Sequence, residues 1–111
     1  MRANQLQPEL DLQKMYESDD SAEIVTGYTS DLLSDVMANA QEDSVLITIQ
    51  AHVNTIAVAS ISGINAIIIC NDRPVGDDMI EAAQKENISL YKTTMNQFTV
   101  SYKVYELLNR K

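Results

Sequence analysis

Three short polar loops hold the side chains of this chain that are best suited to bind a ligand. Each loop follows an apolar run typical of a strand, over residues 44–49, 66–70 and 88–92. Hydroxyl, amide, imidazole and guanidinium groups all donate hydrogen bonds to phosphate or carboxylate oxygens. We therefore predict a binding site for a small anionic ligand, formed by Gln50, His52, Asn54, Thr55, Asn71, Arg73, Thr93 and Thr94.

Each of these residues also has a purely structural interpretation. Asn54 or Thr55 would cap the helix that follows residues 44–49, and a capping side chain can still contact a ligand. His52 is the only histidine of the chain, and its alternative is a surface or capping position. Arg73 has a salt bridge as its alternative, with one of the neighbouring carboxylates Asp72, Asp77 and Asp78.

The sequence offers no recognisable catalytic or metal-binding set. It contains no G-x-x-x-x-G-K-[ST] phosphate loop and no G-x-S-x-G motif, and its three glycines are too far apart for a dinucleotide fingerprint. A single histidine and a single cysteine exclude the usual zinc sites, and the acidic residues 72–81 lack the spacing of an EF-hand loop. We therefore predict no catalytic residue, no cofactor and no metal. A small phosphotransferase that depends on His52 is the enzymatic alternative.

Composition and charge limit the class of protein. A chain of 111 residues, 45% hydrophobic and 22% charged, predicts one ordinary folded domain. The net charge of −8 argues against nucleic acids and anionic membranes as partners, because both require clustered Lys and Arg. Without an apolar signal core or a run of about 20 apolar residues, the sequence is typical of a cytoplasmic protein. Cys70 ends an isoleucine run, so we expect a buried, inert thiol.

Helical patterns alternate with the strand-like runs. A first helix, capped by Thr29 or Ser30 with Asp31 in its first turn, would follow a strand over residues 23–26 and bury Leu32, Leu33, Val36, Met37 and Ala40. An almost wholly apolar helix begins near residue 54 and stops at Gly63, and another begins at Asp77 and stops at Asn87. The last helix begins near Asn96. Its apolar face would contain Phe98, Tyr102, Tyr105 and Leu108, either in the core or at a subunit interface.

This order predicts an α/β fold: a layered domain with a largely parallel central sheet flanked by helices. Right-handed crossovers place the ends of successive parallel strands at one edge of the sheet, where open α/β folds bind ligands. The three polar loops would therefore lie side by side. The first twenty residues are less clearly patterned: a helical turn before Pro8 and a strand over residues 10–16 are the expectation.

The same segments resemble the DRTGG domain family. The similarity rests on residues 23–28, 30–38 and 47–54, continues through the runs 66–69 and 88–94, and covers about residues 10–108. It is greatest to the small stand-alone members, often labelled HPr kinase-like or hydrogenase-associated. The Asp-Arg-Thr-Gly-Gly motif itself is absent, because residues 71–76 are Asn-Asp-Arg-Pro-Val-Gly.

The resemblance implies an α/β module similar to the N-terminal domain of HPr kinase/phosphorylase. Such modules also occur fused to phosphotransacetylase-like enzymes and between CBS domains in a pyrophosphatase, where they resemble regulatory or dimerising units. A kinase activity does not carry over, because the phosphate loop belongs to the other half of HPr kinase. We therefore expect a non-enzymatic, homodimeric regulatory module that binds a metabolite or nucleotide. The alternative is a ligand-free scaffold subunit that docks on a larger redox or signalling enzyme.

Overall fold

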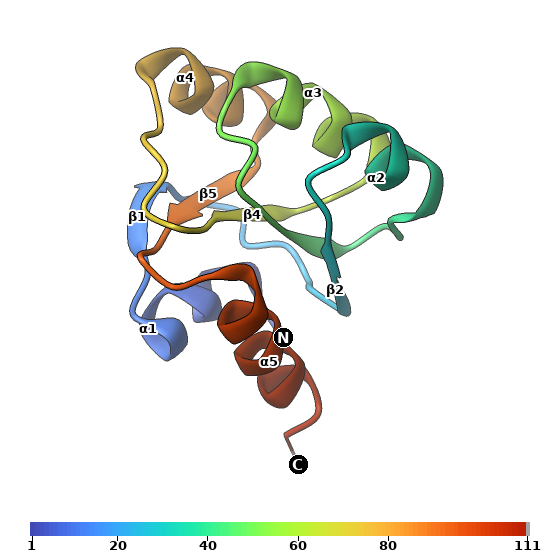
Figure 1. Ribbon diagram of the computed structural model, residues 1–111, viewed down its shortest axis with the longest axis vertical. Coiled ribbons are helices and arrows are strands. Elements are labelled where there is room, and N and C mark those ends of the chain that lie inside the picture. Colours follow the sequence, from blue (N-terminus) through green and yellow to red (C-terminus); the bar gives the residue numbers. More distant parts are fainter. Residues whose placement is uncertain (111) are drawn as a thin grey trace.

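Five strands form one mixed sheet in the computed structural model, which describes residues 1–110 (Figure 1). Across the sheet the order is β1 (Gln13–Tyr16), β5 (Ser89–Lys92), β4 (Ala66–Ile69), β3 (Ser44–Thr48) and β2 (Thr26–Thr29). The strands β2 to β5 are mutually parallel, and only β1 runs antiparallel to its neighbour β5. The predicted α/β fold with a largely parallel sheet is therefore confirmed.

Helices cover both faces of this sheet (Figure 1). On one face lie α2 (Leu33–Asn39), α3 (Val53–Ser62) and α4 (Asp77–Glu86). On the other face lie α1 (Leu6–Leu10), which a short 3₁₀ turn at Ala3–Gln5 precedes, and α5 (Gln97–Leu108). A three-layer arrangement of this kind buries the central strands on both sides, which explains why their sequences are almost continuously apolar.

Alternating side chains of the central strands enter two separate cores. Val45, Ile47 and Ile68 belong to the core under α1 and α5. Leu46 and Ile67 belong to the core under α2, α3 and α4. The alternation follows from the pleat, which turns successive side chains of a strand to opposite faces.

Most helix ends occur where the sequence predicts them. Gly63 ends α3 with a φ of 73°, and a Cβ at this position would lie 2.8 Å from Cγ of Glu42. Asn87 ends α4 in the same left-handed region, which asparagine tolerates well. Asn96 caps the start of α5, and its side chain accepts a 2.9 Å hydrogen bond from the Thr99 N–H.

The start of α2 differs from the prediction. Thr29 is the last residue of β2, and the hydroxyl of Ser30 accepts from the N–H of Leu32 at 3.2 Å, which forms a local turn rather than a helix cap. The helix therefore begins only at Leu33. Asp31 lies before this helix and not in its first turn, so its carboxylate is available for contacts elsewhere.

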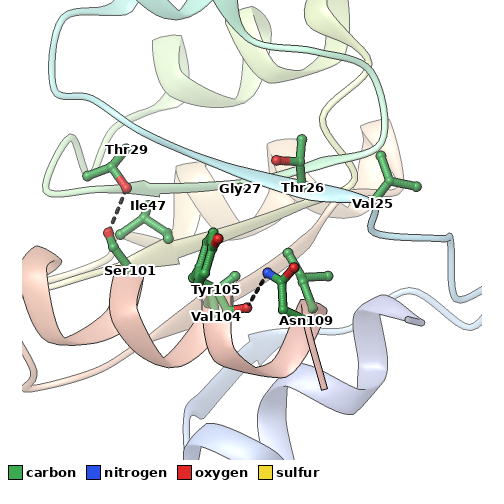
Figure 2. A pocket seen from close by; sticks show the side chains of 10 residues that line it. Val25, Thr26, Gly27, Thr29, Ile47, Ser101, Val104, Tyr105 and Asn109 are labelled. Carbon is green, nitrogen blue, oxygen red and sulfur yellow. Dashed lines mark hydrogen bonds between the residues drawn. The ribbon is translucent and has the colours of Figure 1, made fainter. Parts of the chain in front are cut away.

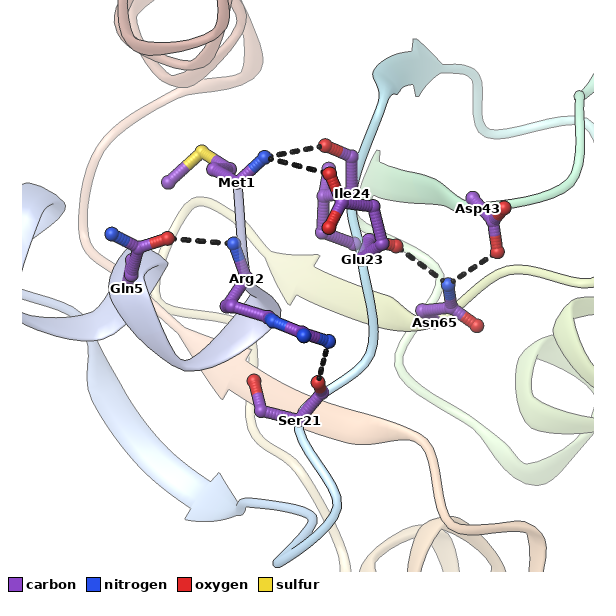
Figure 3. Close-up of polar contacts among 8 residues, drawn as sticks. All are labelled: Met1, Arg2, Gln5, Ser21, Glu23, Ile24, Asp43 and Asn65. Carbon is purple, nitrogen blue, oxygen red and sulfur yellow. Dashed lines mark hydrogen bonds and ion pairs between the residues drawn. The ribbon is translucent and has the colours of Figure 1, made fainter.

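The strand predicted over residues 23–26 is also displaced toward the C-terminus. Figure 3 shows why: the Met1 nitrogen donates to the carbonyl of Ile24 at 3.2 Å, and the Asn65 side chain donates to the carbonyl of Glu23 at 2.8 Å. With these backbone groups already paired, regular pairing with β3 begins at Thr26. The N-terminal segment thereby joins the sheet twice, through this contact and through β1.

Several apolar side chains that the sequence places inside the fold are exposed. In the α2 region Leu32 is 65% and Met37 52% exposed, and Val36 is the fully buried residue of this short helix. In α3, Ile61 is 74% exposed although the helix is apolar almost all round. Of the two alternatives for the aromatic face of α5, the core position is wrong, since Val100 and Val104 are the buried residues of that helix.

Candidate functional site

The loops that follow β3, β4 and β5 lie side by side at one edge of the sheet. Backbone hydrogen bonds of 2.9 Å join them: the N–H of Cys70 donates to Thr48, and the N–H of Thr93 donates to Ile69. A third bond of 2.9 Å, from the N–H of Asn71 to the carbonyl of Met95, continues this pairing beyond the strands. The predicted juxtaposition of the three polar loops is therefore present.

Asp31 is the centre of the polar contacts at this edge. Its Oδ1 accepts three hydrogen bonds, from the hydroxyl of Thr48 at 3.0 Å, the N–H of Ile49 at 2.9 Å and the side-chain amide of Gln97 at 2.9 Å. The Gln50 side chain also donates to the carbonyl of Asp31 at 2.9 Å. One carboxylate thus connects the loop after β2, the end of β3 and the start of α5.

Gln50 and His52 lie together at the start of α3. The Gln50 side-chain oxygen is 3.1 Å from Nε2 of His52, and the Gln50 carbonyl accepts from the hydroxyl of Thr55 at 2.7 Å. His52 is exposed and is the N-cap residue, but its side chain does not cap the helix. The N–H groups of the first turn, at Val53 and Asn54, have no acceptor within the helix.

The predicted capping roles of Asn54 and Thr55 are therefore wrong. The helix begins at Val53, so Asn54 lies inside its first turn with an exposed side chain. Thr55 is fully buried, and its hydroxyl stabilises the preceding loop through the carbonyl of Gln50. Of these two residues, only Asn54 has a side chain that a ligand could reach.

The loop after β4 exposes the guanidinium of Arg73. Asn71 and Asp72 both have positive φ, 62° and 52°, which turns the chain sharply before Arg73. Asp72 pairs with Lys92, with an oxygen–nitrogen distance of 3.3 Å. Within residues 1–110 Arg73 takes part in no salt bridge, so the alternative of a pairing with a nearby aspartate does not occur.

The loop after β5 divides its two threonines between the interior and the surface. Thr93 is buried, and its hydroxyl accepts from the N–H of Met95 at 3.2 Å. Thr94 is exposed beside it. Among the predicted contacts, Thr93 therefore shapes the loop, while Thr94 presents a free hydroxyl to the solvent side.

The Cys70 thiol lies beneath these loops and is fully buried, as predicted. Burial, and to a smaller extent the charge of Asp31, raises its pKa to about 11, so the thiol stays protonated and unreactive at neutral pH. In the part of the chain that the structure describes, no three His, Cys, Asp or Glu side chains gather as a metal site requires. No helix there is long and apolar enough to span a bilayer.

A second region lies beside β2, the outermost strand of the sheet, between this strand and α5 (Figure 2). A groove of about 420 Å³ runs along this edge, and the hydroxyls of Thr29 and Ser101 form a 2.7 Å hydrogen bond across one end of it. Its lining is uncharged and consists of Val25, Thr26, Gly27, Thr29, Ile47, Ser101, Val104, Tyr105, Leu108 and Asn109. The sequence did not indicate this groove, because its two walls come from segments about 75 residues apart.

The fold is shared with a solved regulatory structure. The crystal structure of the CBS and DRTGG domains of the regulatory region of Clostridium perfringens pyrophosphatase, complexed with its activator diadenosine tetraphosphate, matches with a TM-score of 0.74 and 14% sequence identity. The match covers 92% of this chain and 45% of that chain, so this chain spans less than half of its length. No protein-family model and no curated protein matches the sequence. The chain therefore has the DRTGG-like fold that the resemblance predicted.

Proposed function

We propose that this chain is a non-enzymatic regulatory module that binds a small anionic ligand at the ends of β3, β4 and β5. The observation that carries the proposal is the start of α3, where the first N–H groups of the helix follow the exposed His52. The neighbouring loop after β4 exposes Arg73. A helix start with unpaired N–H groups is electropositive and favours a phosphate or carboxylate. The pyrophosphatase region that shares the fold is complexed with an anionic nucleotide.

The remaining polar groups of the edge would hold the site in shape. The hydrogen bonds of Asp31 fix Gln50 and the end of β3, and Gln50 in turn contacts His52. Such preorganisation lowers the entropy that ligand binding must overcome. Recognition would consist of hydrogen bonds from Gln50, His52, Asn54, Asn71, Arg73 and Thr94, with no covalent step.

A thermal-shift screen of the purified chain against nucleotides, phosphorylated sugars and carboxylates tests this proposal. A ligand at one hundred times its dissociation constant adds about 2.7 kcal/mol to the free energy of unfolding. For a domain of this size that is a rise of several degrees in the melting temperature. We expect at least one phosphorylated compound to produce such a shift, and we expect Arg73→Ala and His52→Ala to abolish it.

Lys85→Ala is the matched control. Lys85 is an exposed cation in the last turn of α4, whose end lies at the opposite edge of the sheet. This variant changes the net charge as Arg73→Ala does, but it should retain the ligand-induced shift. Equal loss in Lys85→Ala and Arg73→Ala would mean that overall charge, and not the strand-end loops, determines binding.

The proposal includes a homodimer. One observation favours a second candidate function, a scaffold subunit that docks on a larger enzyme. Phe98, Tyr102 and Tyr105 form an exposed aromatic face on α5. Exposed apolar patches are typical of surfaces that another protein covers. If no ligand in the screen stabilises the chain, the scaffold subunit that docks on a larger enzyme becomes the better account. Capture of that enzyme from the native host would then test the scaffold function.

A further inference from the structure

We infer that the free edge of β2 and the aromatic face of α5 form one surface that a second copy of this chain covers. The inference deepens the homodimer of the proposed function by naming the surface that would form it. We call this surface the β2–α5 surface. It consists of the groove beside β2 and the exposed residues Phe98, Tyr102 and Tyr105.

The exposed aromatic area is large enough to contribute substantially to a dimer. Phe98 is 83%, Tyr105 70% and Tyr102 60% exposed. At roughly 200 Å² for an aromatic side chain, these fractions leave about 400 Å² of aromatic surface on each molecule. A standard interface buries about 800 Å² per partner, so the aromatic face supplies about half of that area before the groove is counted.

The two edge strands of the sheet differ in their protection against pairing. β1 carries Lys14, which lies 3.8 Å from Glu17, and its register shifts between Lys14 and Tyr16. Charges and irregular register are the usual means by which proteins keep an edge strand from pairing with another chain. β2 has neither, since Thr26–Thr29 is uncharged and in regular register with β3. The edge of β2 is therefore free to meet another chain.

The surface suits a copy of itself better than a charged partner. The ten residues that line the groove carry no charge, although the chain as a whole has a net charge of −8. Two copies can therefore meet at the groove without placing a charged side chain in it, and the Glu106 carboxylate beside the aromatic face already accepts from the Tyr102 hydroxyl at 2.9 Å. A twofold interface must also be self-complementary, and here a projecting aromatic face lies beside a hollow of about 420 Å³.

Measurement of molar mass by light scattering on a gel-filtration column tests the surface directly. At about 100 µM the chain should elute at twice its mass of 12.4 kDa, because a dimer with micromolar affinity is then mostly associated. The double variant Phe98→Glu/Tyr102→Glu and the groove variant Val25→Glu should elute as monomers. Circular dichroism confirms that each variant is folded.

Ile61→Glu is the matched control, because Ile61 is an equally exposed apolar residue on α3, away from this surface. It should remain a dimer. A monomeric parent chain, a double variant that stays dimeric, or dissociation caused equally by Ile61→Glu would each overturn the inference. Ligand-induced stabilisation is measured separately, so loss of the β2–α5 dimer leaves the ligand-binding proposal intact. A failure to find a stabilising ligand likewise leaves the dimer surface intact.

Discussion

The strand-end loops and the β2–α5 surface expose different kinds of groups for different reasons. In the loops most polar side chains already have partners, and Asp31 alone accepts three hydrogen bonds. His52, Arg73 and a few small polar groups remain exposed, together with the carboxylates of Asp72, Asp77 and Asp78. On α5 the aromatic side chains Phe98, Tyr102 and Tyr105 are exposed, beside the exposed charged residues Lys103 and Glu106.

This difference indicates how each region would act. A polar, internally braced edge that exposes the side chains of His52 and Arg73 suits a small charged ligand, because its geometry is set before binding. An exposed aromatic face beside an uncharged groove suits a protein surface, because burial of apolar area provides the free energy. Gln97 connects the two regions, since it begins α5 and donates to Asp31 at 2.9 Å.

The largest expected effect concerns the bracing of the loops. Asp31→Ala leaves the donors at Thr48, Ile49 and Gln97 without their acceptor, and we expect a loss of about 3 kcal/mol in the free energy of unfolding. Urea denaturation measures this loss. Asp35→Ala is the matched control.

Asp35 accepts from the hydroxyl of Tyr28 and from the side chain of Asn39, both at 2.8 Å, but no backbone group depends on it. Hydrogen bonds near the surface contribute less, so Asp35→Ala should cost under about 1 kcal/mol. Equal losses of unfolding free energy in the two variants would show that Asp31 does not hold the strand-end loops together. The strand-end loops would then not be the more rigid of the two regions.

A smaller effect concerns the Cys70 thiol, which is buried beneath the strand-end loops. Burial raises the pKa of Cys70 to about 11, so above pH 9 the unfolded chain releases its thiol proton before the folded chain does. The free energy of unfolding should therefore be unaffected at neutral pH and should fall by about 2 kcal/mol between pH 9 and pH 11. Chemical denaturation across this range measures the slope.

Cys70→Ala isolates that contribution. The variant should be less stable at every pH, because it leaves a small cavity, but its stability should decline less between pH 9 and pH 11. Tyr91 contributes to both proteins above pH 10, since burial and its hydrogen bond to Glu17 raise its pKa. If the free energy of unfolding of the two proteins declined in parallel between pH 9 and pH 11, the Cys70 thiol would not be shielded from water beneath the loops.

The sequence predicted the position of the polar edge because strand order and handedness alone determine it. It missed the role of Asp31, whose partners Thr48 and Gln97 lie 17 and 66 residues away in sequence. On α5 the sequence contains two apolar stripes, and spacing cannot decide which of them faces the sheet. The branched pair Val100 and Val104 packs inside, and the aromatic stripe is left exposed.

The smallest expected effect concerns the exposed side chains of Arg73 and His52. Among the residues that the structure describes, Arg73 forms no salt bridge, and the His52 side chain is hydrogen-bonded to Gln50 alone. We therefore expect Arg73→Ala and His52→Ala to change the free energy of unfolding by less than about 0.5 kcal/mol. Urea denaturation without ligand checks this. A larger loss would assign these side chains to the fold and remove the reason to assign them to a ligand.

The most direct test of the central claim is an NMR titration that compares the two regions in one experiment. Amide chemical shifts would be followed while inorganic phosphate, ATP or diadenosine tetraphosphate is added to the isotope-labelled chain. We predict saturable shifts at residues 50–55, 71–73 and 93–97, with little change along β2 and the outer face of α5. Shifts confined to the groove between β2 and α5, or no shift with any of the three compounds, would contradict binding at the strand-end loops.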